Sequence, residues 1–340
     1  MELSVVFYGT SSSVPSARRN TASVLLRAGG DRILVDCGEG TQRQMQKSTG
    51  LVQVDDIYLT HFHADHFLGL PGLIKTYDLL ERERPLRIVG PPGLGDLFKN
   101  LSRIIGKRRY RIDLRELNPG EAIRYDGYEM RAFAVDHGVR ANGYAFVEDE
   151  RKGEFNPEKA IELGVQPGPD FGRLQRGETV IGSKGPVDPS EIIGESRQGR
   201  KVVITGDTRP CEMTRIAAHR ADLLVHDTSF TEAEVERAHK TGHSTAREVA
   251  MLAREAEVVQ LALVHISSRY HVGAVLEEAR EIFPGAIAPR DFDIFEIPFP
   301  ERGAPIHIDR GARPKRAPKS PHGESEEAVK AADAADEADR

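Results

Sequence analysis

The stretch Thr60-His61-Phe62-His63-Ala64-Asp65-His66 places three imidazoles and a carboxylate within six consecutive residues, His61 to His66. It follows Asp56-Ile57-Tyr58-Leu59, which has the pattern of a buried strand, and it precedes Phe67-Leu68-Gly69-Leu70, which begins an apolar helical segment. The cluster is therefore predicted to lie on a loop at the carboxyl end of a strand. Open α/β folds place their chemistry at such loops, so the stretch also predicts an α/β fold.

The residue types of this cluster are those of a metal site. Histidine nitrogens and carboxylate oxygens are the ligands that zinc takes where thiolates are absent. Alternate side chains of a loop can converge, so His61 and His63 could share one metal while Asp65 and His66 face a neighbouring one. The alternative is a set of hydrogen-bonded loop residues. Crowding three imidazoles without a metal invites repulsion whenever two are protonated, so we predict the metal site.

The composition is that of a globular protein. The chain has 340 residues, a net charge of −6 and 39% hydrophobic residues, enough for one large core or two smaller ones. No run approaches the roughly 20 apolar residues of a membrane span. Residues 1–8 lack the marks of a signal peptide and indicate a first strand. Cys37 and Cys211 make no disulfide framework, so we expect a cytoplasmic protein without a membrane partner.

Alternating and helical patterns divide the chain into elements. Strands are expected at 3–8, 21–26, 32–36, 55–60, 87–90, 128–135, 142–147, 201–207, 221–225, 258–264 and 291–297. Helices are expected at 41–47, 67–82, 94–105, 211–220, 231–240, 244–256 and 272–283, the sixth capped near Ser244. The residues between 99 and 115 are rich in Lys and Arg, and taken alone they indicate a solvated face.

Two segments depart from this pattern. Residues from about 150 to 199 are rich in Gly, Pro and charge, and no helix or strand is predicted among them. An insertion of that length is functional or disordered, and we expect a protruding arm. Residues 309–340 carry a basic piece and then an Ala/Glu/Asp stretch, so we expect a disordered charged tail whose basic piece either touches RNA or is solvated. The catalytic domain is expected to span residues 1–308.

Three further metal-binding residue types stand at the ends of predicted strands: His137, Asp207 and His265. Each alone is better explained as a strand-end hydrogen-bonding group. Strand ends cluster at one edge in a layered α/β fold, however, so together with the histidine cluster they predict a two-metal site. One metal would take His61, His63 and His137, the other Asp65, His66 and His265, and Asp207 would bridge the two.

Several motifs resemble those of one known family. His61-Phe62-His63-Ala64-Asp65-His66 is similar to the signature of the metallo-β-lactamase superfamily. Within it the chain resembles the ribonuclease Z family, the tRNA 3′-processing endonucleases, over about residues 1–300. The motifs that carry this resemblance are Phe7-Tyr8-Gly9-Thr10, Asp36-Cys37-Gly38-Glu39-Gly40-Thr41-Gln42, Thr205-Gly206-Asp207-Thr208-Arg209, Gly242-His243-Ser244 and His265-Ile266-Ser267-Ser268-Arg269-Tyr270.

The resemblance implies a fold and a mechanism. The fold would be an αββα sandwich with the metals at one edge. Two zinc ions per subunit would activate a water for attack on a phosphodiester, with Asp65 as ligand and general base and His243 as proton donor to the leaving 3′-oxygen. The products would be tRNA with a 3′-hydroxyl and a trailer with a 5′-phosphate. The residue types alone leave manganese and iron open as alternatives to zinc.

The resemblance also implies how substrate is held. Pro167, Gly168 and Pro169 resemble the tip of the family's exosite arm, which clamps the tRNA elbow. The family forms homodimers in which one subunit's arm holds the precursor tRNA that the other cleaves. Basic residues of the arm and of the 99–115 stretch would contact phosphates, so binding should weaken with salt.

One loop departs from the family pattern. Many members carry Pro-x-Lys-x-Arg-Asn, a loop linked to discrimination against a 3′-terminal CCA, whereas here Ala17 follows Pro15 and Ser16 in place of the Lys. CCA rejection is therefore left open, and Arg18 could supply the charge. Two other functions are alternatives. One is a relative acting on small phosphodiesters or aryl sulfates, which would have little need of the arm. The other is an RNA-binding protein without catalysis, against which the complete ligand set argues.

Overall fold

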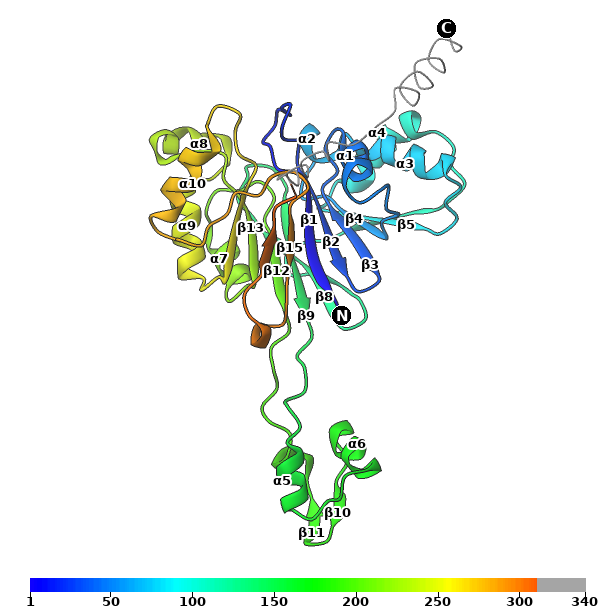
Figure 1. Cartoon of the computed structure of the whole chain (residues 1–340). Helices are drawn as coiled ribbons and strands as arrows, with labels where there is room; N and C mark the ends of the chain where they lie inside the picture. Colours follow the sequence, from blue (N-terminus) through cyan, green and yellow to red (C-terminus); the bar gives the residue numbers. More distant parts are fainter. Residues whose placement is uncertain (311–340) are drawn as a thin grey trace, which may run out of the picture.

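The computed structural model describes residues 1–310 (Figure 1). The charged tail predicted from residue 309 lies, beyond Arg310, outside the described residues. In the described part, two β-sheets lie face to face, and a smaller unit projects from one end of the body on two extended segments. No helix within residues 1–310 is long and apolar enough to cross a membrane.

The first sheet has eight strands in the order β16-β15-β1-β2-β3-β4-β5-β6. Their bounds are β1 Leu3–Gly9, β2 Ser23–Ala28, β3 Asp31–Val35, β4 Asp56–Tyr58, β5 Leu86–Gly90, β6 Ile112–Glu116, β15 Ile294–Glu296 and β16 Ile306–Ile308. Strands β3 to β6 are parallel, and the remaining neighbours pair antiparallel. The carboxyl ends of the parallel strands thus meet at one edge, which receives the histidine cluster.

The second sheet has six strands in the order β14-β13-β12-β9-β8-β7. Their bounds are β7 Ala122–Arg124, β8 Tyr128–Ala134, β9 Asn142–Glu148, β12 Lys201–Ile204, β13 Leu223–Asp227 and β14 Gln260–Val264. β12, β13 and β14 are parallel, so their carboxyl ends also share one edge.

Both faces of the first sheet are buried at β1, which explains why this strand is a nearly continuous apolar run. Alternate residues of a strand point to opposite faces. Phe7 therefore joins the core between the two sheets, with Tyr144 and Phe146 of β9. Tyr8 joins a second core under the helices of the first sheet. A third core lies between the second sheet and its helices, which completes the predicted αββα order.

The helices form the two outer layers (Figure 1). The first sheet is covered by α1 Thr41–Ser48, α3 Leu70–Leu79 and α4 Leu94–Ile105, and the second by α7 Glu212–Ala218, α9 Ala246–Glu255 and α10 Val272–Arg280. Shorter helices are α2 Ala64–Phe67, α8 Val235–Thr241, η2 Glu232–Glu234 and η3 Pro300–Arg302.

Three expectations for individual elements are wrong. The helix expected at 67–82 begins only at Leu70 and ends at Leu79, as α3. A break after α2 separates the two helices and lets the Gly69 N–H donate to the Cys37 carbonyl at 2.9 Å. The cap of α9 is Thr245, not Ser244, because Thr245 and Glu248 form a capping box. Strand β6 overlaps the end of the 99–115 basic stretch, where no strand was expected. It forms because it pairs with β5, although its last three residues are exposed.

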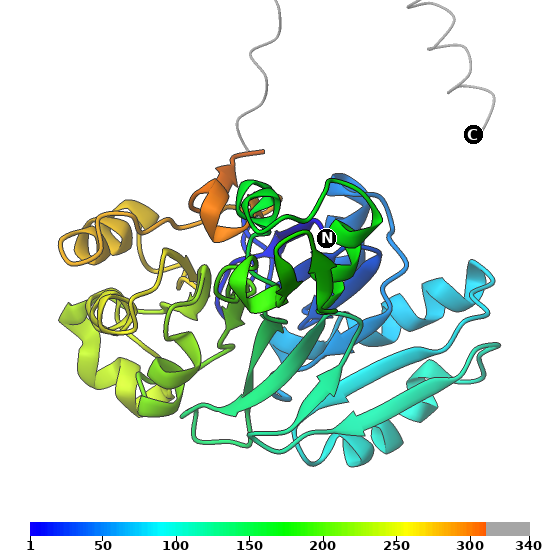
Figure 2. The same cartoon turned by 90° about the horizontal axis from the view of Figure 1, so that it is seen from below.

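The arm contains regular structure that was not expected: α5 Pro157–Glu162, α6 Pro169–Arg176, β10 Val180–Gly182, β11 Gly185–Val187 and η1 Pro189–Glu191. Its apolar cluster includes Ala160, Leu174 and Val180 and consists only of arm residues. One or two apolar residues from each short element suffice for so small a cluster, so the sequence shows no long apolar run. Seen from below, the arm projects toward the viewer (Figure 2).

Candidate metal centre

The seven predicted ligands lie just after the ends of four strands. His61, His63, Asp65 and His66 follow β4, His137 follows β8, Asp207 follows β12 and His265 follows β14. Gly206 allows the approach of the two sheets at this point, because it has φ of +64° and a Cβ there would lie 2.7 Å from the Thr60 Cβ. The structure therefore brings the seven residues to one edge, at the junction of the sheets.

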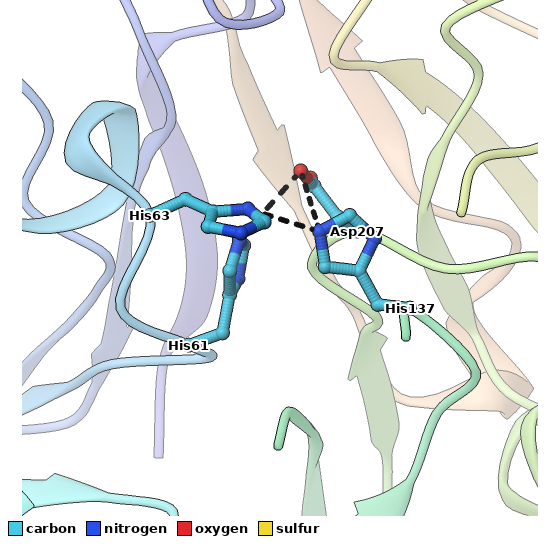
Figure 3. Close-up of side chains that lie close together, drawn as sticks. All are labelled: His61, His63, His137 and Asp207. Atoms are coloured by element: carbon cyan, nitrogen blue, oxygen red, sulfur yellow. Dashed lines mark hydrogen bonds and ion pairs between the residues drawn. The ribbon is translucent and has the colours of Figure 1, made fainter. Parts of the chain in front are cut away.

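His61, His63, His137 and Asp207 form the first group (Figure 3). One ligand atom from each lies within 4.8 Å of the others. Asp207 Oδ2 is 3.8 Å from Nε2 of His61 and 3.8 Å from Nε2 of His137, and His137 Nε2 is 3.1 Å from His63 Nδ1. Three imidazoles and a carboxylate thus face one small volume.

Asp65, His66, His265 and Asp207 form the second group. Asp65 Oδ2 lies 3.5 Å from His66 Nε2 and 3.3 Å from His265 Nε2. Asp207 approaches both histidines as well, with Oδ2 at 3.3 Å from His66 Nε2 and Oδ1 at 3.3 Å from His265 Nε2. Asp207 is the residue common to the two groups, which is the position expected of a bridging carboxylate.

Unpaired buried atoms at this edge test whether the residues suit a metal. His61 Nε2, His66 Nε2 and Asp207 Oδ1 are buried and have no hydrogen-bond partner. Native proteins pair almost all such atoms, because an unpaired buried polar atom is costly. The three atoms belong to the two groups described above, so divalent cations would satisfy them together. The donor set fits a hard or borderline divalent metal.

The pKa values of the histidines at the site are shifted in opposite directions. Burial, aided by the neighbouring His66, holds the pKa of His61 well below its usual value, and burial also lowers the pKa of His137. Burial alone would lower the pKa of His265, but Asp207, Asp227 and Asp65 outweigh it and raise that pKa to about 10.

A second layer of hydrogen bonds orients the ligands. Asp36 Oδ2 lies 2.7 Å from His66 Nδ1, the Gly242 carbonyl lies 2.7 Å from His137 Nδ1, and Ser229 Oγ lies 2.9 Å from His265 Nδ1. Each contact engages Nδ1 and leaves Nε2 facing the centre, as partners of metal-binding histidines do. Asp36 and Ser229 are not among the site residues predicted from the sequence. Asp36 could have been recognised from the sequence, since it is an acidic residue at the end of the strand predicted at 32–36.

His243, the expected proton donor, lies beside the second group. Its Nδ1 is 2.8 Å from Asp227 Oδ2, and its ring stacks on that of His265 with centroids 5.3 Å apart. Burial would lower the pKa of His243, but the charge and hydrogen bond of Asp227 outweigh it and raise that pKa. Asp227 was missed because the strand was expected to end at residue 225, whereas β13 continues to Asp227. The same rule of an acid at a strand end would have found it.

The predicted exosite residues lie elsewhere. Pro167, Gly168 and Pro169 are exposed at the start of α6 in the arm. They come from the unit that projects away from the body, so they take no part in the cluster of ligands (Figure 1).

Comparisons with known proteins agree with this architecture. A model of the metallo-beta-lactamase superfamily matches residues 17–256. A Ribonuclease Z of Archaeoglobus fulgidus is 45% identical over 307 residues, covering 88% of this chain and 100% of its own. A Ribonuclease Z of Haloferax volcanii is 46% identical over 305 residues, covering 88% of this chain and 96% of its own.

A solved structure of similar shape is that of human tRNase Z, short form. It has a TM-score of 0.64 and 25% identity, and the match covers 87% of this chain and 99% of that one. The metallo-beta-lactamase fold protein YhfI from Bacillus subtilis, with a TM-score of 0.63 and 18% identity, shares the fold. The fold and the two residue clusters support a divalent metal at this edge. The chain belongs to the ribonuclease Z family of the metallo-beta-lactamase superfamily.

Proposed function

We propose that the chain is an endoribonuclease that removes the 3′ trailer from precursor tRNA, leaving a 3′-hydroxyl on the tRNA and a 5′-phosphate on the trailer. The observation that carries the proposal is the combination of a complete set of metal donors with a projecting arm on one chain. Similarity over 88% of this chain to proteins named Ribonuclease Z supports it.

The metals are proposed to be two zinc ions per chain. His61, His63 and His137 would hold one, Asp65, His66 and His265 the other, and Asp207 would contact both. When bound, such ions supply Lewis-acid polarisation of a phosphodiester and acidify water. The proposal of zinc rests on the histidine-rich donor set.

The chain's own residues would move the protons. The Asp65 side chain is 11% exposed, so it borders both the ligand cluster and the solvent from which water enters. Asp65 is proposed to accept the proton of the attacking water. His243 is 12% exposed, and because Asp227 engages its Nδ1, its Nε2 is left to donate a proton to the leaving 3′-oxygen. The two groups flank His265, so they could serve the two sides of one phosphate.

Positive charge on the body and the arm would hold the RNA. Arg103, Lys107 and Arg108 are exposed at the end of α4 and beyond it, and no ion pair within residues 1–310 engages them. In the arm, exposed Pro167, Gly168 and Pro169 are proposed to meet the tRNA elbow. Arg18, Arg43 and Lys47 line a cavity of about 350 Å³. Arg18 is proposed to supply the charge that Ala17 lacks.

We also propose that the protein is a cytoplasmic homodimer in which the arm of one subunit holds the RNA that the other cleaves. Sedimentation equilibrium would give the mass of the assembly. Mixing a subunit that lacks residues 155–195 with a His63→Ala subunit should restore cleavage in the mixed dimer. Absence of such restoration would contradict the arrangement.

The decisive experiment is cleavage of a precursor tRNA, with and without CCA, mapped at nucleotide resolution before and after chelation. Cleavage at the 3′ end of the acceptor stem that chelation stops and zinc restores would support the proposal. Deleting residues 155–195 should greatly weaken this cleavage and spare hydrolysis of bis(p-nitrophenyl) phosphate. Equal loss on both substrates would refute the role of the arm, and a wild-type protein that cuts only the small diester would refute the proposed function.

A further inference from the structure

The arm meets the body through a contact that the proposed function does not use. Its two connecting segments, 149–156 and 193–199, are joined to each other by the bridges Arg151↔Arg197 and Phe155↔Ile193. The apolar cluster of the arm includes no residue of the body. The angle between arm and body must therefore be set where these segments leave the sheet, at their base.

A short loop of the body binds the base of the arm. Phe299 and Glu301 belong to the turn around η3, which follows β15. The Arg151 guanidinium lies 3.8 Å from the centre of the Phe299 ring, and the Arg200 guanidinium lies 4.1 Å from it. The single ring therefore contacts Arg151 of the first connecting segment and Arg200, which directly follows the second, and its quadrupole attracts both cations.

Glu301 joins the same two segments by charge. Arg151 donates to both of its carboxylate oxygens, at 2.7 and 2.8 Å, and Arg197 donates to one of them at 3.3 Å. Bidentate guanidinium–carboxylate pairs fix direction as well as distance. Because Arg151 and Arg197 also exchange backbone hydrogen bonds of 2.8 Å, Glu301 clamps the first bridge of the arm as one unit.

Arg200 anchors this contact to the body. Its side chain is 2% exposed and donates to Glu148 at 2.6 and 2.8 Å. It also donates to the carbonyls of Met1 and Ile297, each at 2.9 Å. The ring of Phe299 thus rests on a fixed guanidinium on the body side and on Arg151 on the arm side. We name Phe299 and Glu301 the latch.

We propose that the latch of Phe299 and Glu301 sets the angle at which the arm leaves the body and thereby selects RNAs that can contact the arm and a metal site together. The inference rests on the proposed function of the arm. A connecting segment of seven residues at about 3.3 Å each spans roughly 20 Å, so a pivot of about 15° at its base would move the far end by about 5 Å. Such a shift exceeds what a hydrogen-bonded contact to RNA tolerates.

The expected effect of opening the latch is on binding and not on chemistry. If the arm then spends about one tenth of its time at the productive angle, the apparent dissociation constant rises about tenfold. Phe299→Ala should therefore raise the KM for precursor tRNA about tenfold, with kcat at saturating RNA and hydrolysis of bis(p-nitrophenyl) phosphate within twofold of the wild type. Phe299→Tyr, which keeps the ring, should behave as the wild type.

A charge variant tests the second half of the latch. Glu301→Gln should raise the same KM severalfold, while Arg302→Gln, on the same turn and exposed, serves as the matched control. An unchanged KM in Phe299→Ala and Glu301→Gln, in a protein whose arm deletion does raise KM, would overturn the proposal. So would equal losses on the RNA and on the small diester. Failure of the wild type and the arm deletion to differ on RNA would instead refute the proposed role of the arm.

The angle can also be measured without a substrate. In a Cys211→Ser background, spin labels at Ile181→Cys in the arm and Leu79→Cys in the body would sit at positions that are 83% and 77% exposed. We expect a broader distance distribution in Phe299→Ala than in Phe299→Tyr. Equal widths in the two variants would overturn the proposal.

Discussion

Replacing Asp36 by Asn removes the carboxylate that orients His66 and leaves the shape of the side chain unchanged. Asp36 is 4% exposed, and its Oδ2 lies 2.7 Å from His66 Nδ1. Its oxygens also accept from the N–H and hydroxyl of Thr60, at 2.8 and 2.9 Å. Asp36 has φ of +58°, a conformation that Asn adopts more readily than most residues, so the backbone should tolerate the change.

The size of the effect follows from the contact that is lost. A hydrogen bond to a charged group contributes about 1.5–3 kcal/mol. Replacing the group behind a metal-binding histidine costs about 10–100-fold in metal affinity, or about 1.4–2.8 kcal/mol. The two ranges agree, so Asp36→Asn should weaken one of the two proposed zinc sites by about 10–100-fold. His61, His63 and His137 keep their own contacts, so the other site should keep its affinity to within a few fold.

The zinc affinity of each of the two sites per chain would be measured by competition with a chromophoric chelator. Asp113→Asn is the matched control, because Asp113 is paired with Arg111 on the surface strand β6, away from the metal edge. Thermal unfolding of the metal-free protein separates loss of affinity from loss of fold. Two sites of wild-type affinity in Asp36→Asn would refute the assignment of Asp36 as the group that positions His66.

Three further predictions concern other parts of the molecule. His63→Ala should abolish cleavage of precursor tRNA and weaken one zinc site, and unchanged turnover would contradict the two-metal assignment. His243→Gln should lower kcat by about 10²–10⁴-fold with the zinc content unchanged, as expected for loss of a proton donor, and loss of zinc would instead indicate a ligand. Arg82→Met should reduce the free energy of unfolding, measured by urea denaturation, by about 3 kcal/mol. Arg82 is 1% exposed and donates to the carbonyls of Val54, Arg84 and Pro85. A change below about 1 kcal/mol would show that water replaces these hydrogen bonds.

Much of the fold follows from local pattern. The buried runs of β1 and β13 are apolar on both faces because each sheet is covered on both sides, and such runs stand out in a sequence. The helices of the arm do not, because each contributes only one or two residues to a small cluster. Strand β6 was hidden for another reason: pairing with β5 holds it in the sheet, although Leu114, Arg115 and Glu116 are exposed.

The residues of the candidate site also differ in how readily the sequence reveals them. The spacing of His61, His63, Asp65 and His66 on one loop made these ligand types visible without any structure. His137, Asp207 and His265 could be associated with them only through the rule that strand ends share an edge. Asp227 follows the same rule but was missed because the strand was expected to end at residue 225. Ser229 gave no signal, since a hydroxyl has no distinguishing neighbours along the chain.

The sequence by itself determined the residue types and their place at the ends of elements, because hydrophobic period and side-chain chemistry are local properties. Only the tertiary structure decided which of those side chains meet. The junction of the two sheets brings His137 to within 3.1 Å of His63, and a turn at residues 299–301 contacts the base of an arm that begins about 150 residues earlier. Such contacts depend on how separate elements pack, and no local pattern encodes that packing.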